Sequence, residues 1–497
     1  MSCRALLSFM VGALGPPGLA AVVVATSGDE PLRPQFHFTP ARNFMNDPNG
    51  LVFFDGEYHL FYQHNPEGEV WGHMSWGHAV SPDLLRWRHL PVALREEDGI
   101  MIFSGSVVVD RHDNSGLCGG GPCLVAIYTG HTSERQTQNL AVSRDRGRTF
   151  VKYPGNPVLD LGRRDFRDPK VFWHDGTRRW IMAAVLPDEH KVRFFASPDL
   201  RRWEALSDFG PAGATGGVWE CPDLFLLPVE GEPGVTRHVL DVDINPGGRV
   251  GGSAGQYFVG TFDGTRFTSD DPPTTTLWAD YGKDFYASLS FSDIPDSDGR
   301  RVWMGWMSNW LYANQEPTTP WRGVQSVPRS LSLRRLPEGL RLVQTPIAEL
   351  SSLRVSPQPR SVVRGGPLPG SADITFEVVR GAGEGGVRFS NVAGEEVVVG
   401  VRPDPLEVFV DRRRSRLAPF HEAYPERHAG PVRWRDGRIT LRLLFDRTTL
   451  EVFANDGETV ISERIYPTRP LDRLEVVAAG KAVPSPVHVH ELRSVWR

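Results

Sequence analysis

Three acidic residues of this 497-residue chain stand in similar local settings and are the residues best able to do chemistry. Asp47 lies in Asn-Asp-Pro-Asn-Gly, Asp168 in Arg-Asp-Pro and Glu220 in Glu-Cys-Pro, and an apolar segment follows each. Proline fixes its own φ and restricts the residue before it, so stiff backbone is expected around each carboxylate. One such motif is most simply a turn, but three together predict a site.

Two carboxyl groups on either side of a glycosidic bond are the apparatus of glycoside hydrolysis. One attacks the anomeric carbon and the other protonates the leaving oxygen. Glu220, flanked by Trp and Cys, is predicted to be the acid because an apolar setting disfavours its charge. Asp47 is predicted to be the nucleophile. Asp168, next to Arg167, is predicted to stay ionised and to support a cationic transition state.

A competing motif, Gly-Gly-Ser-Ala-Gly at residues 251–255, fits the Gly-x-Ser-x-Gly pattern of serine hydrolases. That nucleophile elbow needs a strand-to-helix turn in an α/β sheet. The residues that follow, 256–259, indicate a strand and not an amphipathic helix. The motif is therefore interpreted as a flexible loop.

The elements that must position the carboxylates show a repeat. Ser or Thr, any residue, Asp, a short turn and then Trp or Phe recur from Ser81, Ser143, Ser197 and Thr261, at intervals of 62, 54 and 64 residues. Each copy follows an apolar strand. A repeat of about 60 residues in an all-β chain indicates propeller blades of four strands. Residues 36–345 then hold five blades, of which the fifth, with residues 301–307, lacks the turn motif.

The innermost strands of a propeller surround a central channel, so acidic residues at about one per blade can meet there. The predicted fold class is all-β, a five-bladed β-propeller followed by a C-terminal β-sandwich. The propeller is assigned to residues 32–348. Residues 349–371, rich in Pro and Gly, are predicted to form a linker. Residues 372–497 show short alternating strands typical of a sandwich.

The net charge of −5 and a pI of about 6.3 argue against a nucleic-acid partner. Residues 1–26 hold Arg4 and a long apolar run, which predicts a cleaved signal peptide and a secreted or cell-envelope location; a membrane anchor is the alternative. Stable membrane insertion after cleavage is not expected. Cys118 and Cys123 flank a Gly-rich loop and can form a disulfide. No zinc-ligand spacing occurs, so neither a metal nor a cofactor is predicted.

The motifs resemble those of glycoside hydrolase family 32, the β-fructofuranosidases, over residues 37–466. The resemblance is carried by residues 46–50, Phe-Ser-Gly-Ser at 103–106, residues 167–169 and residues 220–222. It implies a five-bladed propeller with a sandwich and a retaining mechanism without metal. It also implies Asp47 as nucleophile, Glu220 as acid/base and Asp168 as transition-state stabiliser. The fructosyl pocket would be lined by Asn46, Gln63, Trp71, Phe103, Ser104, Arg167 and Trp310.

Within the family, residues 62–66, 71–78 and 306–310 are similar to those of microbial exo-acting fructanases of the levanase and exo-inulinase type. The expected function is secreted, retaining exo-β-fructosidase activity on levan, inulin and sucrose. The alternatives are a fructosyltransferase, an invertase with sucrose as its main substrate, and a non-catalytic fructan-binding propeller. The presence of all three carboxylates disfavours the last. The preferred fructan and the oligomeric state stay open.

Overall fold

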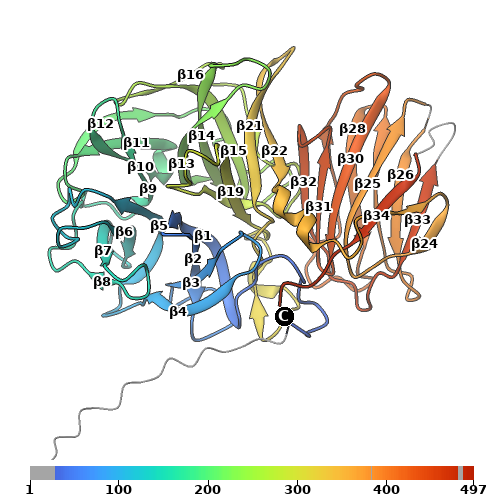
Figure 1. The fold of residues 1–497 in the computed structure, drawn as a ribbon, viewed down its shortest axis with the longest axis horizontal. Coiled ribbons are helices and arrows are strands. Elements are labelled where there is room, and N and C mark those ends of the chain that lie inside the picture. Colours follow the sequence, from blue (N-terminus) through green and yellow to red (C-terminus); the bar gives the residue numbers. More distant parts are fainter. Residues whose placement is uncertain (1–27, 382, 479–484, 497) are drawn as a thin grey trace, which may run out of the picture.

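The computed structural model describes residues 28–381, 383–478 and 485–496 as a propeller and a sandwich that lie side by side (Figure 1). The predicted all-β class is confirmed. The helices of these ranges are three short 3-10 turns, η1 (Pro187–Glu189), η2 (Ala313–Gln315) and η3 (Ala348–Leu353). Within the same ranges no helix is long and apolar enough to span a membrane. The predicted signal segment lies outside the described residues.

The propeller has five antiparallel blades, each built from four strands in chain order. The first blade holds β1 (Asn43–Phe54), β2 (Glu57–Asn65), β3 (Ser75–Ser81) and β4 (Arg88–Leu94), and the second holds β5 (Met101–Asp110), β6 (Cys123–His131), β7 (Gln136–Ser143) and β8 (Val151–Lys152). The third holds β9 (Arg167–His174), β10 (Arg179–Leu186), β11 (Lys191–Ser197) and β12 (Glu204–Phe209). The fourth holds β13 (Val218–Pro228), β14 (Thr236–Asn245), β15 (Ala254–Phe262) and β16 (Phe267–Ser269), with β17 (Leu277–Trp278) paired to β15. The fifth holds β18 (Tyr286–Ser290), β19 (Arg301–Trp306), β21 (Arg329–Leu336) and β22 (Gly339–Pro346).

The first strands of the blades form the inner ring of the propeller. β1, β5, β9, β13 and β18 contact one another in that order, and β18 contacts β1. A short strand of the last quarter of the propeller, β20 (Trp321–Arg322), pairs in parallel with the start of β1. The backbone N–H of Asn43 also donates to the carbonyl oxygen of Pro320 at 2.7 Å. The chain therefore closes the ring by hydrogen bonds between its late and early segments.

The repeated Asp turn joins the third and fourth strands of the first four blades. In the first blade Asp83 Oδ1 accepts the backbone N–H groups of Leu85 and Arg86, at 3.1 and 2.8 Å. The same role falls to Asp145, Asp199 and Asp263. A side-chain oxygen that satisfies turn N–H groups explains why Asp recurs there. The fifth blade joins β21 to β22 without the motif, as the sequence predicts.

The sandwich consists of two six-stranded antiparallel sheets. One sheet has the order β23 (Arg360–Val362), β34 (Val487–Glu491), β25 (Ser371–Val379), β30 (Arg438–Asp446), β31 (Thr449–Ala454) and β32 (Thr459–Arg464). The other has the order β24 (Gly365–Pro367), β33 (Arg473–Ala478), β26 (Gly385–Ser390), β27 (Glu396–Pro403), β28 (Leu406–Arg414) and β29 (Arg427–Pro431). The prediction of a linker over residues 349–371 is wrong, because β23 and β24 lie within it. Both are three-residue edge strands, where Pro and Gly are tolerated.

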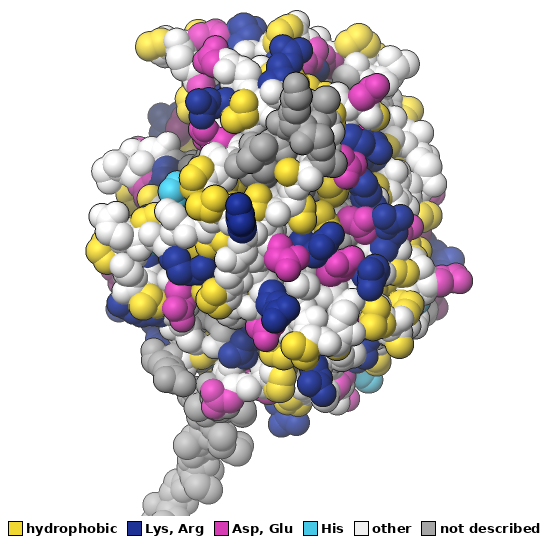
Figure 2. All heavy atoms as spheres, turned by 90° about the vertical axis from the view of Figure 1, so that its right-hand side faces the viewer, with side chains coloured by type: hydrophobic (Ala, Val, Ile, Leu, Met, Phe, Trp, Pro, Cys, Tyr) yellow, Lys and Arg dark blue, Asp and Glu magenta, His cyan; other side chains and the backbone are white. Residues whose placement is uncertain are grey.

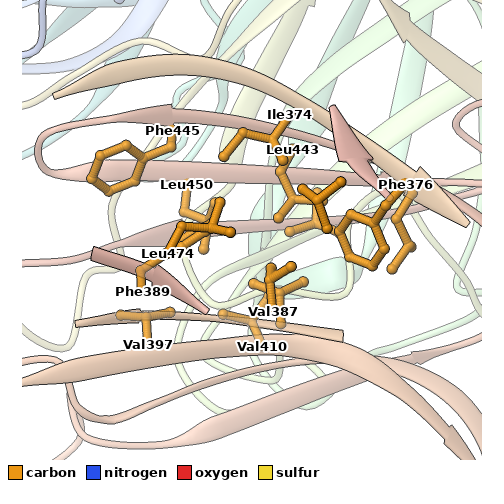
Figure 3. Close-up of a cluster of buried hydrophobic side chains, with 14 of the residues drawn as sticks. Ile374, Phe376, Val387, Phe389, Val397, Val410, Leu443, Phe445, Leu450 and Leu474 are labelled. Carbon is orange, nitrogen blue, oxygen red and sulfur yellow. The ribbon is translucent and has the colours of Figure 1, made fainter. Parts of the chain in front are cut away.

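The core of the sandwich is apolar. Side chains of β25 and β30, such as Phe376 and Leu443, face side chains of β26 and β28, such as Val387 and Val410 (Figure 3). The outer face carries basic and acidic side chains intermixed, without a field of one sign (Figure 2). The strands of the sandwich therefore alternate in the ordinary way, with apolar side chains toward the core and polar side chains toward solvent.

The contact between the two domains, in contrast, buries charged groups. Arg329 of the propeller donates to Glu451 Oε2 of the sandwich at 2.9 Å from Nε and at 2.5 Å from Nη2. His37 Nε2 lies 2.8 Å from Glu451 Oε1, and its Nδ1 lies 3.0 Å from Asp446 Oδ2. All four side chains are fully buried. Partnered charges thus hold the sandwich against the propeller.

Candidate active site

Each strand of the inner ring breaks its regular pairing near a residue of the candidate site, and in four of the five strands that residue was predicted. The pairing of β1 with β2 shifts between Met45 and Pro48, on either side of Asp47. Asp168 and Glu220 lie at corresponding shifts in β9 and β13, and β5 and β18 shift beside Ser104 and after Tyr286. A bulge turns a side chain out of the alternation of its strand. Side chains from separate blades meet at these irregularities, because Ser104 and Cys221 contact Asp47, and Tyr286 donates to Glu220. Asp47 lies inside β1, not at a strand end.

Asp47 is buried among neutral hydrogen-bond donors. Its Oδ2 accepts the hydroxyl of Ser104 at 2.6 Å, and its Oδ1 accepts the side-chain amide of Asn46 at 3.0 Å. Burial raises the pKa of Asp47 to about 6. The Ser104 and Asn46 hydrogen bonds oppose this rise, and the charge of Glu220 adds to it. Asp47 is therefore ionised at neutral pH but close to its titration range.

Asp168 occupies a left-handed backbone conformation, with φ +61°. Its Oδ2 accepts the backbone N–H of Cys221 at 3.0 Å and lies 3.7 Å from Nε of Arg167. Burial raises the pKa of Asp168 to about 7, although Arg167 opposes the rise. Arg167 therefore does not outweigh burial, and the predicted full ionisation of Asp168 stays a prediction.

Glu220 lies in a polar setting, contrary to the prediction. Its Oε1 accepts from Nη2 of Arg167 at 3.1 Å, and its Oε2 accepts the hydroxyl of Tyr286. Neighbours in a strand point to opposite faces of the sheet. The flanking Trp219 accordingly packs into the blade and donates its indole N–H to Ala214. The side chain of Glu220 is 20% exposed, so a substrate can reach it.

Arg167 forms ion pairs with two of the three carboxylates, those of Asp168 and Glu220. Besides its contacts to Asp168 and Glu220, its Nη1 donates to Asp165 at 3.1 Å and to Gln136 at 3.4 Å. The guanidinium is mostly buried. One cation shared by two carboxylates leaves the cluster with an excess of negative charge.

The predicted pocket residues divide into supporting and lining groups. Gln63 donates to Asn49 at 2.8 Å and to the carbonyl oxygen of Ile102 at 3.0 Å, so it ties β2 to β1 and β5. Trp71 is 39% exposed and lies edge-on to Phe103, with ring centroids 6.1 Å apart. This pair offers aromatic surface to a ligand.

Trp310 forms a second aromatic wall. Its ring centroid lies 4.8 Å from that of Trp306 and 6.4 Å from that of Phe44. Phe44 belongs to β1, the strand that carries Asp47. The backbone N–H of Trp310 donates to the hydroxyl of Ser253 at 3.2 Å. Ser253 directly precedes β15, and the chain continues as a strand. The serine-hydrolase reading is therefore wrong, and Ser253 supports the loop that carries Trp310.

Sequence reasoning missed Tyr286 and the placement of Cys221. Tyr286 begins β18 and is buried, with its hydroxyl on Glu220. The thiol of Cys221 lies 3.6 Å from Asp47 Oδ2 and 3.9 Å from Asp168 Oδ2. The signal for Tyr286 was its position at the start of the fifth inner strand. The predicted disulfide between Cys118 and Cys123 is confirmed.

One cavity lies at the candidate site and another lies apart from it. A small cavity of about 20 Å³ lies at its floor, lined by Asn49, Ser104, Asp168, Lys170 and Cys221 among others. A larger one, of about 560 Å³, lies between β22 of the propeller and the sandwich and contains none of the predicted site residues. We call the space above this floor, bordered by Asp47, Asp168, Glu220 and Trp310, the bowl; the 560 Å³ cavity is separate from it.

Carboxyl groups with separate partners at the mouth of one channel are suited to cleaving a glycosidic bond, and with this fold they define a glycoside hydrolase. Two family descriptions match consecutive parts of the chain. Residues 37–346 match the N-terminal domain of glycosyl hydrolases family 32, and residues 348–493 match the C-terminal domain of that family. The chain belongs to glycoside hydrolase family 32, which confirms the resemblance found in its motifs.

Among its relatives, the levanase of Bacillus subtilis (strain 168) is 46% identical over 94% of this chain and 71% of its own length. The exo-inulinase of Aspergillus awamori has a similar crystal structure, with a TM-score of 0.90 and 33% identity over 94% of this chain and all of that one. A fructofuranosidase variant of Schwanniomyces occidentalis, solved with fructosylnystose, has a TM-score of 0.86 and 30% identity, and covers 95% of this chain and all of that one.

Proposed function

We propose that this protein is a secreted, retaining exo-β-fructosidase that hydrolyses terminal β-D-fructofuranosyl residues of fructans and sucrose. The observation that carries the proposal is the convergence of Asp47 and Glu220, from different blades, with different hydrogen-bond partners. The likeness to a levanase and to an exo-inulinase supports fructans as the substrate class. The apolar N-terminal run and the Cys118–Cys123 disulfide support export to an oxidising compartment.

In the first step Asp47 attacks the anomeric carbon and forms a fructosyl-enzyme ester, while Glu220 gives its proton to the leaving oxygen. Ser104 and Asn46 donate to the Asp47 carboxylate and so orient it for attack. In the second step Glu220 takes a proton from water, which attacks the same carbon and releases fructose. Asp168, held by the Cys221 N–H, accepts hydroxyl groups of the bound fructosyl unit and stabilises positive charge on it.

The experiment compares wild-type protein with Asp47→Asn and Glu220→Gln, on levan, inulin and sucrose side by side. Each variant is expected to lose fructose release by about 10³-fold or more, with an unchanged circular dichroism spectrum. Asp55→Asn is the control, because Asp55 lies in the exposed turn after β1 and pairs with exposed Arg146. It is expected to retain full activity.

The products decide among the alternatives. Retention predicts that the first fructose released has the β configuration, as seen by NMR at early times. Wild-type turnover in either carboxylate variant would contradict the assigned roles. Sugar binding without turnover by the wild type would indicate a fructan-binding propeller. Longer oligosaccharides formed at high sucrose concentration would indicate a fructosyltransferase.

A further inference from the structure

His131, at the end of β6, lies beside the catalytic bowl and has no role in the proposed mechanism. Its ring stacks flat on Phe103, with centroids 4.2 Å apart and planes 7° from parallel. Phe103 in turn contacts Trp71. His131 is half-buried, so the stack fixes its ring while part of the ring stays accessible.

The orientation of the neighbouring Gln136 side chain is determined by its partners. Its Oε1 accepts the backbone N–H of Phe166 at 2.9 Å and Nη1 of Arg167 at 3.4 Å. Both partners are donors only, so this atom must be the amide oxygen. The amide nitrogen of Gln136 therefore faces Nδ1 of His131, at 3.2 Å.

This amide fixes the tautomer of His131. An amide NH₂ group only donates, so Nδ1 of His131 must accept and the proton of the neutral ring lies on Nε2. Burial and the charge of Arg167 lower the pKa of His131, so the ring is neutral at neutral pH. The hydrogen bonds formed among the described residues include none from this Nε2–H. An oriented donor is left for a ligand.

The same network locates the donor relative to the reaction. Arg167 links Gln136, the partner of His131, to Glu220. Glu220 protonates the leaving oxygen, so the leaving sugar must lie on its side of the bowl. His131 is joined to Glu220 through Gln136 and Arg167, so it borders that side of the site.

We propose that His131, held by its stack on Phe103 and by Gln136, is a specificity-determining residue of the leaving-group subsite, where its Nε2–H donates to a hydroxyl of the departing sugar. The inference rests on the proposed function. It assigns to His131 a contact with the part of the substrate that leaves, and none with the fructosyl unit that is transferred to Asp47.

The test uses His131→Phe, which keeps a stacked ring and removes the donor, with two substrates. 1-Kestose has a leaving group with hydroxyls, whereas 4-nitrophenyl β-D-fructofuranoside has one without. One neutral hydrogen bond is worth about 1 kcal/mol, which is about fivefold in rate. His131→Phe is expected to lower kcat/KM about fivefold on kestose and to leave it within about twofold on the aryl substrate. His131→Ala, which also loses the stack, is expected to lose more on kestose.

Ser133→Ala is the matched control, in the exposed part of the same turn, and is expected to behave as wild type on both substrates. An equal loss on both substrates after His131→Phe would overturn the inference, since it would indicate a general effect on the bowl. No loss on kestose would also overturn it. A wild-type protein inactive on both substrates would instead refute the proposed function, so the two failures are distinguishable.

Discussion

The bowl of the candidate site and the contact between the domains both bury carboxylates, but the pKa values of Asp47 in the bowl and Glu451 in the contact shift in opposite directions. Glu451 in the contact receives Arg329, His37 and the backbone N–H of Val327. Burial acts to raise its pKa, but these partners hold the pKa below its ordinary value. Asp47 in the bowl receives only neutral donors, and burial raises its pKa to about 6.

The difference shows that the whole set of partners, and not burial alone, decides whether the pKa of a buried carboxylate rises or falls. Asp280, also in the contact, shares Arg329 with Glu451 and has a pKa raised to about 6. Asp168 shares Arg167 with Glu220 in the same way. One guanidinium does not neutralise the burial of two carboxylates. In the bowl the pKa of both Asp47 and Asp168 is raised. In the contact Arg329 serves both Asp280 and Glu451, and of these two only the pKa of Asp280 is raised.

The largest expected effect is in the domain contact. Glu451→Gln leaves Arg329 and His37 without their shared anion, so the free energy of unfolding is expected to fall by about 3–5 kcal/mol. Urea denaturation measures it. The control is Glu232→Gln at the exposed pair with Arg335, where solvent screens the charges and no measurable change is expected. An equal loss of unfolding free energy in the two variants would show that the buried carboxylate contributes no more to stability than the exposed one.

A smaller effect of opposite sign is expected in the bowl. Asp47 has an ordinary pKa of 3.8, raised to about 6 by folding. The folded protein thus binds this proton more tightly, and ionisation costs stability increasingly as the pH rises from about 4 through 6. Asp47→Asn removes that cost and is expected to stabilise the protein by up to about 3 kcal/mol at pH 7.5. The gain should shrink toward zero at pH 4. Urea midpoints at both pH values test it, and a loss of stability at pH 7.5 would contradict the comparison.

The smallest expected effect sharpens the role of the neutral donors. Ser104→Ala removes a hydrogen bond that lowers the pKa of Asp47, so that pKa should rise by about one unit. In the proposed mechanism Asp47 must be ionised to attack, so the acidic limb of the kcat/KM profile on sucrose should move to higher pH. Ser106→Ala is the control, since the Ser106 hydroxyl donates to the carbonyl oxygen of Pro169 instead. An unmoved acidic limb in Ser104→Ala would mean that another group sets it.

Much of the fold was predictable because its signals are local. An Asp that caps its own turn and an aromatic residue at or just before the start of the next strand recur in four blades, and each works within about seven residues of chain. The short edge strands β23 and β24 were missed because their partners, β34 and β33, lie more than a hundred residues away. Pro and Gly there resemble a linker until those partners are in place.

The order of the residues was enough to predict the candidate reactive side chains, the repeat of the blades and the family. The surroundings of those side chains emerged only with the folded chain. It put Arg167 and Tyr286 around Glu220, buried Asp168 enough to override its neighbouring Arg, and oriented His131 through Gln136. The physical reason is that conformation in a turn depends on neighbours in the chain. Charge state and hydrogen-bond direction depend instead on burial and on partners that arrive from other blades.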